Sequence, residues 1–334
     1  MTDYLVPIAL LLGAAVVIYL SCEFFVNGVE WIGRKLDFGQ KAVGTVLAAF
    51  GTALPESVVT LVAVAFGKDA AHKQIGVGAA LGGPLVLATV AYAVVGWSLY
   101  ATKRPYPGND ADRRAFGHLS RDQGWFLCIF LVKLGLGLVA FTIKPWLGIA
   151  FLAAYGLYVW KETRTGGDGE EGEDLEPLKL QPKAAVPSLA MAFLQTGIAV
   201  AVIYLASRLF VSQIGVLGPR LGVPPQLLAL FVSPIATELP ETMNAIIWIR
   251  QGKVRLALAN ISGAMMIQAT IPTAFGLFWT PWRLDAPLLI AGGVTAVAIA
   301  VLFAAFRSGR AHRGLLCAMA LGYLAFVGAI VAFG

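Results

Sequence analysis

The sequence predicts an all-α integral membrane protein of ten transmembrane helices, arranged as two inverted five-helix repeats with broken helices at the centre. Three observations predict this fold: an extreme apolar composition, an alternation of basic and less basic connections, and a short motif that occurs twice. The 334 residues are 58% hydrophobic and 13% charged, with a mean hydropathy of +0.76. Soluble domains carry roughly a quarter charged residues, so this composition excludes an ordinary soluble enzyme.

The predicted spans are continuous apolar stretches bounded by charged or turn residues. A bilayer span needs about 20 predominantly apolar residues, and the chain offers ten such stretches. They cover residues 4–33, 40–66, 74–99, 124–142, 145–160, 187–215, 224–249, 255–279, 286–306 and 314–333.

The basic residues predict the orientation of these spans. Eighteen of the 25 lysine and arginine residues fall in one alternate set of connections, and five fall in the other. Cytoplasmic connections are enriched in lysine and arginine, so the first set is predicted to be cytoplasmic. We therefore expect a multi-pass protein of the cell membrane with both termini outside the cytoplasm. The bias also explains the net charge of +6 without nucleic acid as a partner.

The composition of residues 163–185 differs from the rest of the chain. This connection is rich in glycine, aspartate and glutamate, and such a segment cannot bury a core. We interpret it as a flexible acidic cytoplasmic linker between a first five-helix repeat at 1–162 and a second at 186–334. An acidic cation sensor is the alternative interpretation, although no EF-hand spacing is present.

A repeated motif relates the two halves. Leu54-Pro55-Glu56 matches Leu239-Pro240-Glu241 at an offset of 185, and Thr52 pairs with Thr237 at the same offset. Because each half holds an odd number of spans, the second half must enter the membrane from the opposite side. This inverted repeat is the arrangement that many secondary transporters use to build a site at the membrane midplane.

The repeated motif places carboxylates inside apolar spans. Glu56 and Glu241 lie near the centres of their spans, where a charge costs at least about 2.5 kcal/mol and marks a functional site by default. Each follows a proline, which removes a backbone hydrogen bond and opens the helix. The structural alternative is a kink whose glutamate pairs with a buried base. Two copies in mirror-image halves favour a site.

The oxygen atoms around these kinks suit a hard cation. Backbone carbonyls, the Thr52 and Thr237 hydroxyls and the two carboxylates are the kind of ligand that Ca²⁺ prefers. Glu238 adds a third carboxylate three residues before Glu241. Crowded carboxylates repel one another, and one that retains a proton without cation gives a route to proton exchange.

Other residues in the spans are expected to have structural roles, with a pathway role as the alternative for Pro84. Lys133 is interpreted as a snorkelling or loop-proximal residue with no further role. Gly82 and Gly83 most simply allow close helix packing. Pro84 is expected to open its span opposite the Glu56 kink.

At these residues the sequence resembles the cation/calcium exchanger superfamily, the membrane region shared by sodium/calcium and calcium/proton exchangers. Residues 51–56, Gly-Thr-Ala-Leu-Pro-Glu, look like the first family repeat, where a Gly-Thr-Ser-x-Pro-Glu motif carries ion ligands; residues 233–245 look like the second. The resemblance implies Glu56 and Glu241 as principal ligands.

The chain departs from the family pattern in two ways. Ala53 and Glu238 replace the motif serine. The partner motif, Gly-Asn-x-x-Gly-Ser-Asn, should fall at 78–84 and 259–265, but only Asn260 survives among its polar positions. A site with fewer protein ligands, or one driven by protons, is therefore expected.

The sequence thus predicts a secondary antiporter that exports a hard cation, Ca²⁺ first, in exchange for Na⁺ or H⁺ by alternating access. No resident cofactor and no enzymatic activity are expected, and the partners are the lipid bilayer and inorganic cations. The first alternative is a degenerate, non-transporting scaffold or regulator of the same fold. A second is an intramembrane enzyme with Glu238 and Glu241 as acid and base, which no nucleophile–base constellation supports. The oligomeric state is left open.

Overall fold

The computed structural model describes residues 2–36, 48–106, 110–164, 175–184 and 186–333. The described residues form helices and no strand. In the first half the helices are α1 (Thr2–Lys35), α2 (Ala48–Phe66), α3 (Ala70–Val86), the π-helical η2 (Leu87–Ala91), α4 (Tyr92–Ala101), α5 (Asp110–Leu138), the 3₁₀ turn η3 (Lys144–Trp146) and α6 (Leu147–Arg164). In the second half they are α7 (Leu189–Leu221), α8 (Pro225–Thr237), α9 (Leu239–Arg250), α10 (Val254–Trp279), α11 (Ala286–Arg307), α12 (Arg313–Ala318) and α13 (Ala320–Phe333).

Several of these helices are built for a bilayer. Six described helical stretches are long and apolar enough to cross a membrane: Tyr4–Lys35, Ala70–Ala101, Leu189–Leu221, Val254–Trp279, Ala286–Arg307 and Arg313–Ala332. The outer ones expose large apolar side chains, with Leu5 61% and Val331 80% exposed. Water would penalise such surfaces, whereas lipid tails accept them. The chain is therefore a multi-pass membrane protein.

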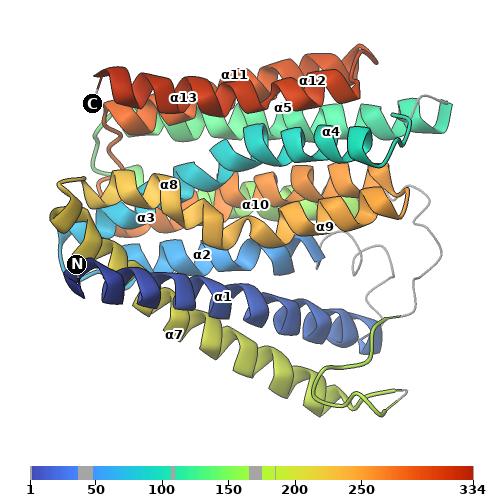
Figure 1. Cartoon of the computed structure of the whole chain (residues 1–334), viewed down its shortest axis with the longest axis horizontal. Coiled ribbons are helices and arrows are strands. Elements are labelled where there is room, and N and C mark those ends of the chain that lie inside the picture. Colours follow the sequence, from blue (N-terminus) through green and yellow to red (C-terminus); the bar gives the residue numbers. More distant parts are fainter. Residues whose placement is uncertain (1, 37–47, 107–109, 165–174, 185, 334) are drawn as a thin grey trace.

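Helices α1 and α7 pack side by side in opposite directions at one side of the molecule (Figure 1). The Tyr4 hydroxyl, near the start of α1, donates to the Arg220 carbonyl near the end of α7 at 3.1 Å. The Gln195 amide, near the start of α7, donates to the Phe24 carbonyl at 2.8 Å. The first helices of the two halves thus run antiparallel, as inversion requires.

The central helices interleave the two halves. Helix α3 packs along α8, and α2 packs along α10, while α4, α5, α11, α12 and α13 lie on the side opposite α1 and α7 (Figure 1). The largest buried apolar cluster joins α3, α4, α5, α10 and α11. The start of α1 and the end of α13 lie at the same end of the molecule (Figure 1).

The two predicted helix breaks differ. In the second half, α8 ends at Thr237 and α9 begins at Leu239, so Glu238 alone separates them, with φ −97° and ψ −1°. In the first half, the expected break at Pro55 is wrong for the described residues, because α2 continues through this proline. Proline removes one hydrogen bond but does not by itself end a helix that is packed on its neighbours.

The second part of the predicted flexible linker is anchored to the helices. The Trp31 indole donates to the Glu176 carbonyl at 2.9 Å, and the Lys179 backbone N–H donates to the Asn27 side chain at 3.1 Å. Leu178 is fully buried against Trp31 and Ala192. Residues 165–174, which carry most of the acidic composition, lie outside the described residues.

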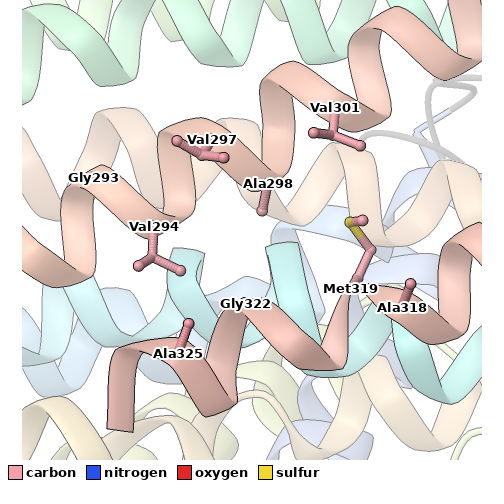
Figure 2. Close-up of a pocket in the computed structure, with 9 residues that line it drawn as sticks. All are labelled: Gly293, Val294, Val297, Ala298, Val301, Ala318, Met319, Gly322 and Ala325. Atoms are coloured by element: carbon pink, nitrogen blue, oxygen red, sulfur yellow. The ribbon is translucent and has the colours of Figure 1, made fainter. Parts of the chain in front are cut away.

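An apolar groove of about 340 Å³ lies between α11 and the α12–α13 segment (Figure 2). Valines, alanines and glycines line it, together with Met319. It holds no ionisable side chain, so it has no part in the cation chemistry described below.

Candidate functional site

Glu56 is a carboxylate buried at an interface between two helices. It lies on α2 with 1% of its surface exposed. Its carboxyl group rests against Gly83 of α3, where an added Cβ would lie 2.7 Å from Cδ and 2.8 Å from Oε1. Only glycine leaves room for this approach. Gly83 therefore leaves space for the Glu56 carboxylate, which is a role beyond the expected helix packing. Gly82 packs directly on the α8 backbone, as expected.

Glu238 occupies the break between α8 and α9. It is 1% exposed, and its two carboxylate oxygens accept hydrogen bonds from the Thr237 hydroxyl at 2.7 Å and the Gln268 amide at 2.6 Å. The helix break explains this geometry, because Glu238 closes α8 by donating its backbone N–H to the Pro234 carbonyl at 2.9 Å. Gln268, on α10, thus holds Glu238 in a fixed orientation.

Glu56 and Glu238 are close enough to interact electrostatically. One comes from the first half of the chain and the other from the second. Glu241, fully buried in the first turn of α9, instead lies within electrostatic range of Cys22 on α1. The helix N-terminus also favours a carboxylate at that position.

The three candidate carboxylates Glu56, Glu238 and Glu241 do not form a metal-holding group among the described residues. Within the described parts of the chain, no group of three His, Cys, Asp or Glu side chains is placed to hold a metal ion. The Thr237 hydroxyl is bonded to Glu238 and to the Ser233 carbonyl. The Thr52 side chain lies outside the described residues. Among the candidate carboxylates, Glu56 and Glu238 lie close enough to interact electrostatically.

The interpretation of Lys133 as a snorkelling residue is wrong. It is 0% exposed, and its ammonium donates to the Ala80 carbonyl of α3 at 2.6 Å and to the Gln268 carbonyl of α10 at 3.5 Å. It interacts electrostatically with Glu56. Lys133 lies at the midpoint of the predicted span 124–142, where a lysine side chain is too deep to reach the membrane surface easily. This depth is the feature of the sequence that could have indicated a buried role.

Trp282 completes the surroundings of this lysine. Its ring lies 5.8 Å from the Lys133 ammonium, and its indole N–H donates to the Lys133 carbonyl at 3.1 Å. Trp282 is fully buried with a φ of +45°, in the left-handed region that bulky residues avoid. Such strain persists only where surrounding contacts enforce it, and here the Lys144 ammonium also holds the Trp282 carbonyl at 2.9 Å.

A second polar cluster lies on α5, α4 and α10. The buried Gln123 amide donates to the Tyr92 hydroxyl at 2.7 Å and the Ser262 hydroxyl at 2.8 Å. Asn260, the surviving polar residue of the second partner motif, is 7% exposed, and its amide nitrogen is without a hydrogen-bond partner. A buried polar group without a hydrogen-bond partner is costly, so the Asn260 amide nitrogen is a candidate contact for a polar ligand.

Buried carboxylates from two interleaved halves, one of them at a helix break, define the class of the protein: a secondary transporter of cations rather than an enzyme. The family model "Sodium/calcium exchanger protein" matches residues 6–163 and 191–332. The chain therefore belongs to the sodium/calcium exchanger family.

Two relatives match nearly the whole chain. The inner membrane protein YrbG of Escherichia coli is 27% identical over 95% of this chain and 94% of its own. The putative antiporter CaxA of Alkalimonas amylolytica is 25% identical over 92% of this chain and 91% of its own. The crystal structure of the H⁺/Ca²⁺ exchanger CAX shares the fold, with a TM-score of 0.68 at 15% identity, covering 97% of this chain and 88% of that one.

Proposed function

We propose that this protein exports Ca²⁺ across the cell membrane in exchange for Na⁺ or H⁺ by alternating access. The observation that carries the proposal is the interaction of Glu56 with Glu238, two buried carboxylates contributed by different halves of the chain. Two buried carboxylates this close repel each other, and a bound cation relieves that repulsion. Family membership and a relative named as a putative antiporter support the same function.

The proposed architecture is ten transmembrane helices in two inverted repeats, residues 1–162 and 186–334, joined by the segment 163–185. The antiparallel packing of α1 on α7 supports the inversion. The proposed orientation, with both termini outside the cytoplasm, follows from the distribution of basic residues. Movement of one set of helices against the other would expose the site to each side in turn.

Glu56 and Glu241 are the proposed principal ligands, and Glu238 is a further ligand or a proton carrier. Thr52 and Thr237 would add hydroxyl oxygens. Ca²⁺ takes six to eight oxygen ligands, so backbone carbonyls and water would complete its shell. The described residues hold no ready group of three acidic ligands, so binding of the cation would require these carboxylates to rearrange.

Counter-ion-dependent transport tests the proposal. Inverted vesicles loaded with Na⁺, or acidified inside, are assayed for ⁴⁵Ca²⁺ uptake with the wild type and with Glu56→Gln. We expect uptake by the wild type and a loss of at least about tenfold in the variant. Glu23→Gln is the matched control, since Glu23 lies on α1 with an exposed side chain. Equal uptake by wild type and Glu56→Gln would remove Glu56 from the mechanism.

A non-transporting scaffold of the same fold is the second candidate. It is favoured by the loss of the family's Asn and Ser ligands and by a lysine ammonium beside Glu56. A scaffold would show no thermal stabilisation by any cation. Stabilisation of the wild type by Ca²⁺ that Glu56→Gln abolishes would exclude it.

A further inference from the structure

The Lys133 ammonium sits in a setting that would suit a free monovalent cation. Two backbone carbonyls accept its hydrogen bonds, the rings of Phe130 and Trp282 lie 5.2 Å and 5.8 Å from it, and the Glu56 carboxylate acts on it electrostatically. Carbonyl oxygens and aromatic faces both attract cations once water is removed.

The two carbonyls are available because of two prolines. In an α-helix the carbonyl of residue i accepts from the N–H of residue i+4, and proline has no N–H. Pro84 lies four residues after Ala80 on α3, and Pro272 lies four residues after Gln268 on α10. Each helix therefore presents one carbonyl without its helical donor, and the Lys133 ammonium reaches both.

Lys133 is held in place from its own side as well. The Trp282 indole N–H donates to the Lys133 carbonyl at 3.1 Å, and the whole lysine is 0% exposed. The ammonium group is therefore held at a fixed position, in contact with helices of both halves.

We propose that Lys133 is a built-in monovalent cation in a setting that would otherwise suit Na⁺, and that it excludes Na⁺ from this position. The inference rests on the proposed function of Ca²⁺ export in exchange for Na⁺ or H⁺, because it says that the site works without a bound Na⁺. One positive charge is supplied by the chain itself, so Glu56 and Glu238 need one fewer charge from solution. Exchange then proceeds without Na⁺ bound between Ala80 and Gln268.

Equilibrium binding of ²²Na⁺ to the purified full-length protein tests this inference without requiring transport. The variants are Lys133→Met, which keeps an apolar side chain of similar length, and Lys161→Met as a control. Lys161 also lies over an aromatic ring, 5.5 Å from Trp125, but its side chain is exposed. We expect no saturable ²²Na⁺ binding by the wild type or Lys161→Met, and about one ion per chain in Lys133→Met, where the two carbonyls and Glu56 are free for a cation.

Saturable ²²Na⁺ binding by the wild type would overturn the inference, as would its absence in a folded Lys133→Met protein. Should Lys133→Met fail to fold, the wild type decides: ⁴⁵Ca²⁺ exchange that is unchanged when Na⁺ is replaced by choline supports the inference, and exchange that requires Na⁺ overturns it. Absence of any ⁴⁵Ca²⁺ exchange, with no effect of Glu56→Gln, would instead refute the proposed function. The ²²Na⁺ binding result would still decide whether Lys133 excludes Na⁺.

Discussion

Gly83 is the position at which a single methyl group tests the geometry of the carboxylate site. A Cβ added there would lie 2.7 Å from Glu56 Cδ and Oε2 and 2.8 Å from Oε1, whereas ordinary contacts begin at 3.4 Å. The carboxyl group must therefore withdraw by about 0.7 Å. Because the obstructed atoms are the end of a flexible side chain, the helices can stay in place.

The displacement is large compared with the tolerance of a cation site. Ca²⁺ binds oxygens at about 2.3–2.6 Å, so a ligand moved by 0.7 Å no longer coordinates it in the same geometry. We expect Gly83→Ala to weaken Ca²⁺ binding and ⁴⁵Ca²⁺ uptake by at least about tenfold, while the cost in folding free energy stays near the low end of about 1–3 kcal/mol.

The assay is ⁴⁵Ca²⁺ uptake into inverted vesicles, with thermal unfolding of the purified protein as a measure of fold. Gly293→Ala is the matched control, since an added Cβ at that position has nothing within 4 Å. Wild-type uptake by a folded Gly83→Ala protein would refute the claim that the Glu56 carboxylate must lie against α3 to bind the cation.

Three further predictions concern stability. Gln268→Leu removes the amide that donates to Glu238 and should lower the free energy of unfolding by about 1–3 kcal/mol; an unchanged melting temperature would contradict this. Trp282→Ala should cost about 3–5 kcal/mol because it empties a fully buried indole site, and a smaller loss in a thermal melt would show that the loop collapses around the cavity. Asp69 caps α3, and the backbone N–H of His72 lowers the pKa of this carboxyl, so its contribution is present above an ordinary aspartate pKa of about 3.9 and is lost as pH falls through the lowered pKa. Asp69→Ala should therefore lower the melting temperature at pH 7, and the difference should shrink at about pH 3; an equal difference at both pH values would argue against the charge.

Much of the fold could be predicted from the sequence because bilayer-spanning helices have a simple physical signature. Apolar runs of the right length follow from the cost of exposing charge or unpaired backbone groups to lipid. Several described helices begin and end close to the predicted limits, as for Val254–Trp279 against 255–279, whereas α5 begins at Asp110, well before the predicted 124. The positions of Glu56, Glu238 and Glu241 inside the protein were predictable because a carboxylate is costly in lipid, although Glu23 on α1 is exposed.

The partners of these carboxylates could not be predicted in the same way. Glu56 meets Gly83, and Lys133 reaches Ala80 and Gln268, through contacts between helices that are far apart in the chain. A one-dimensional reading gives the depth of each residue but not its rotation about the helix axis. The role of Lys133 could not be predicted because a single lysine in a span most often snorkels to the membrane surface. Only its hydrogen bonds to Ala80 and Gln268 show that it is buried between helices.

The Pro-Glu motifs show a further limit of local reasoning. Both were predicted to break their helices, but α2 runs through Pro55 while α8 and α9 separate at Glu238. The difference lies in the context: Glu238 at the break accepts hydrogen bonds from Thr237 at the end of α8 and from Gln268 on the neighbouring helix α10. Sequence alone supplied the residue types for a cation site, and the tertiary contacts decide which pair meets.

Equilibrium ⁴⁵Ca²⁺ binding by the purified protein tests the central claim most directly, namely that buried carboxylates from both halves hold one cation. The account predicts saturable binding of about one ion per chain by the wild type and by Glu23→Gln. It predicts a loss of affinity of at least about tenfold, or about 1.4 kcal/mol, in Glu56→Gln and in Glu238→Gln separately. Wild-type affinity in either of these two variants would contradict it.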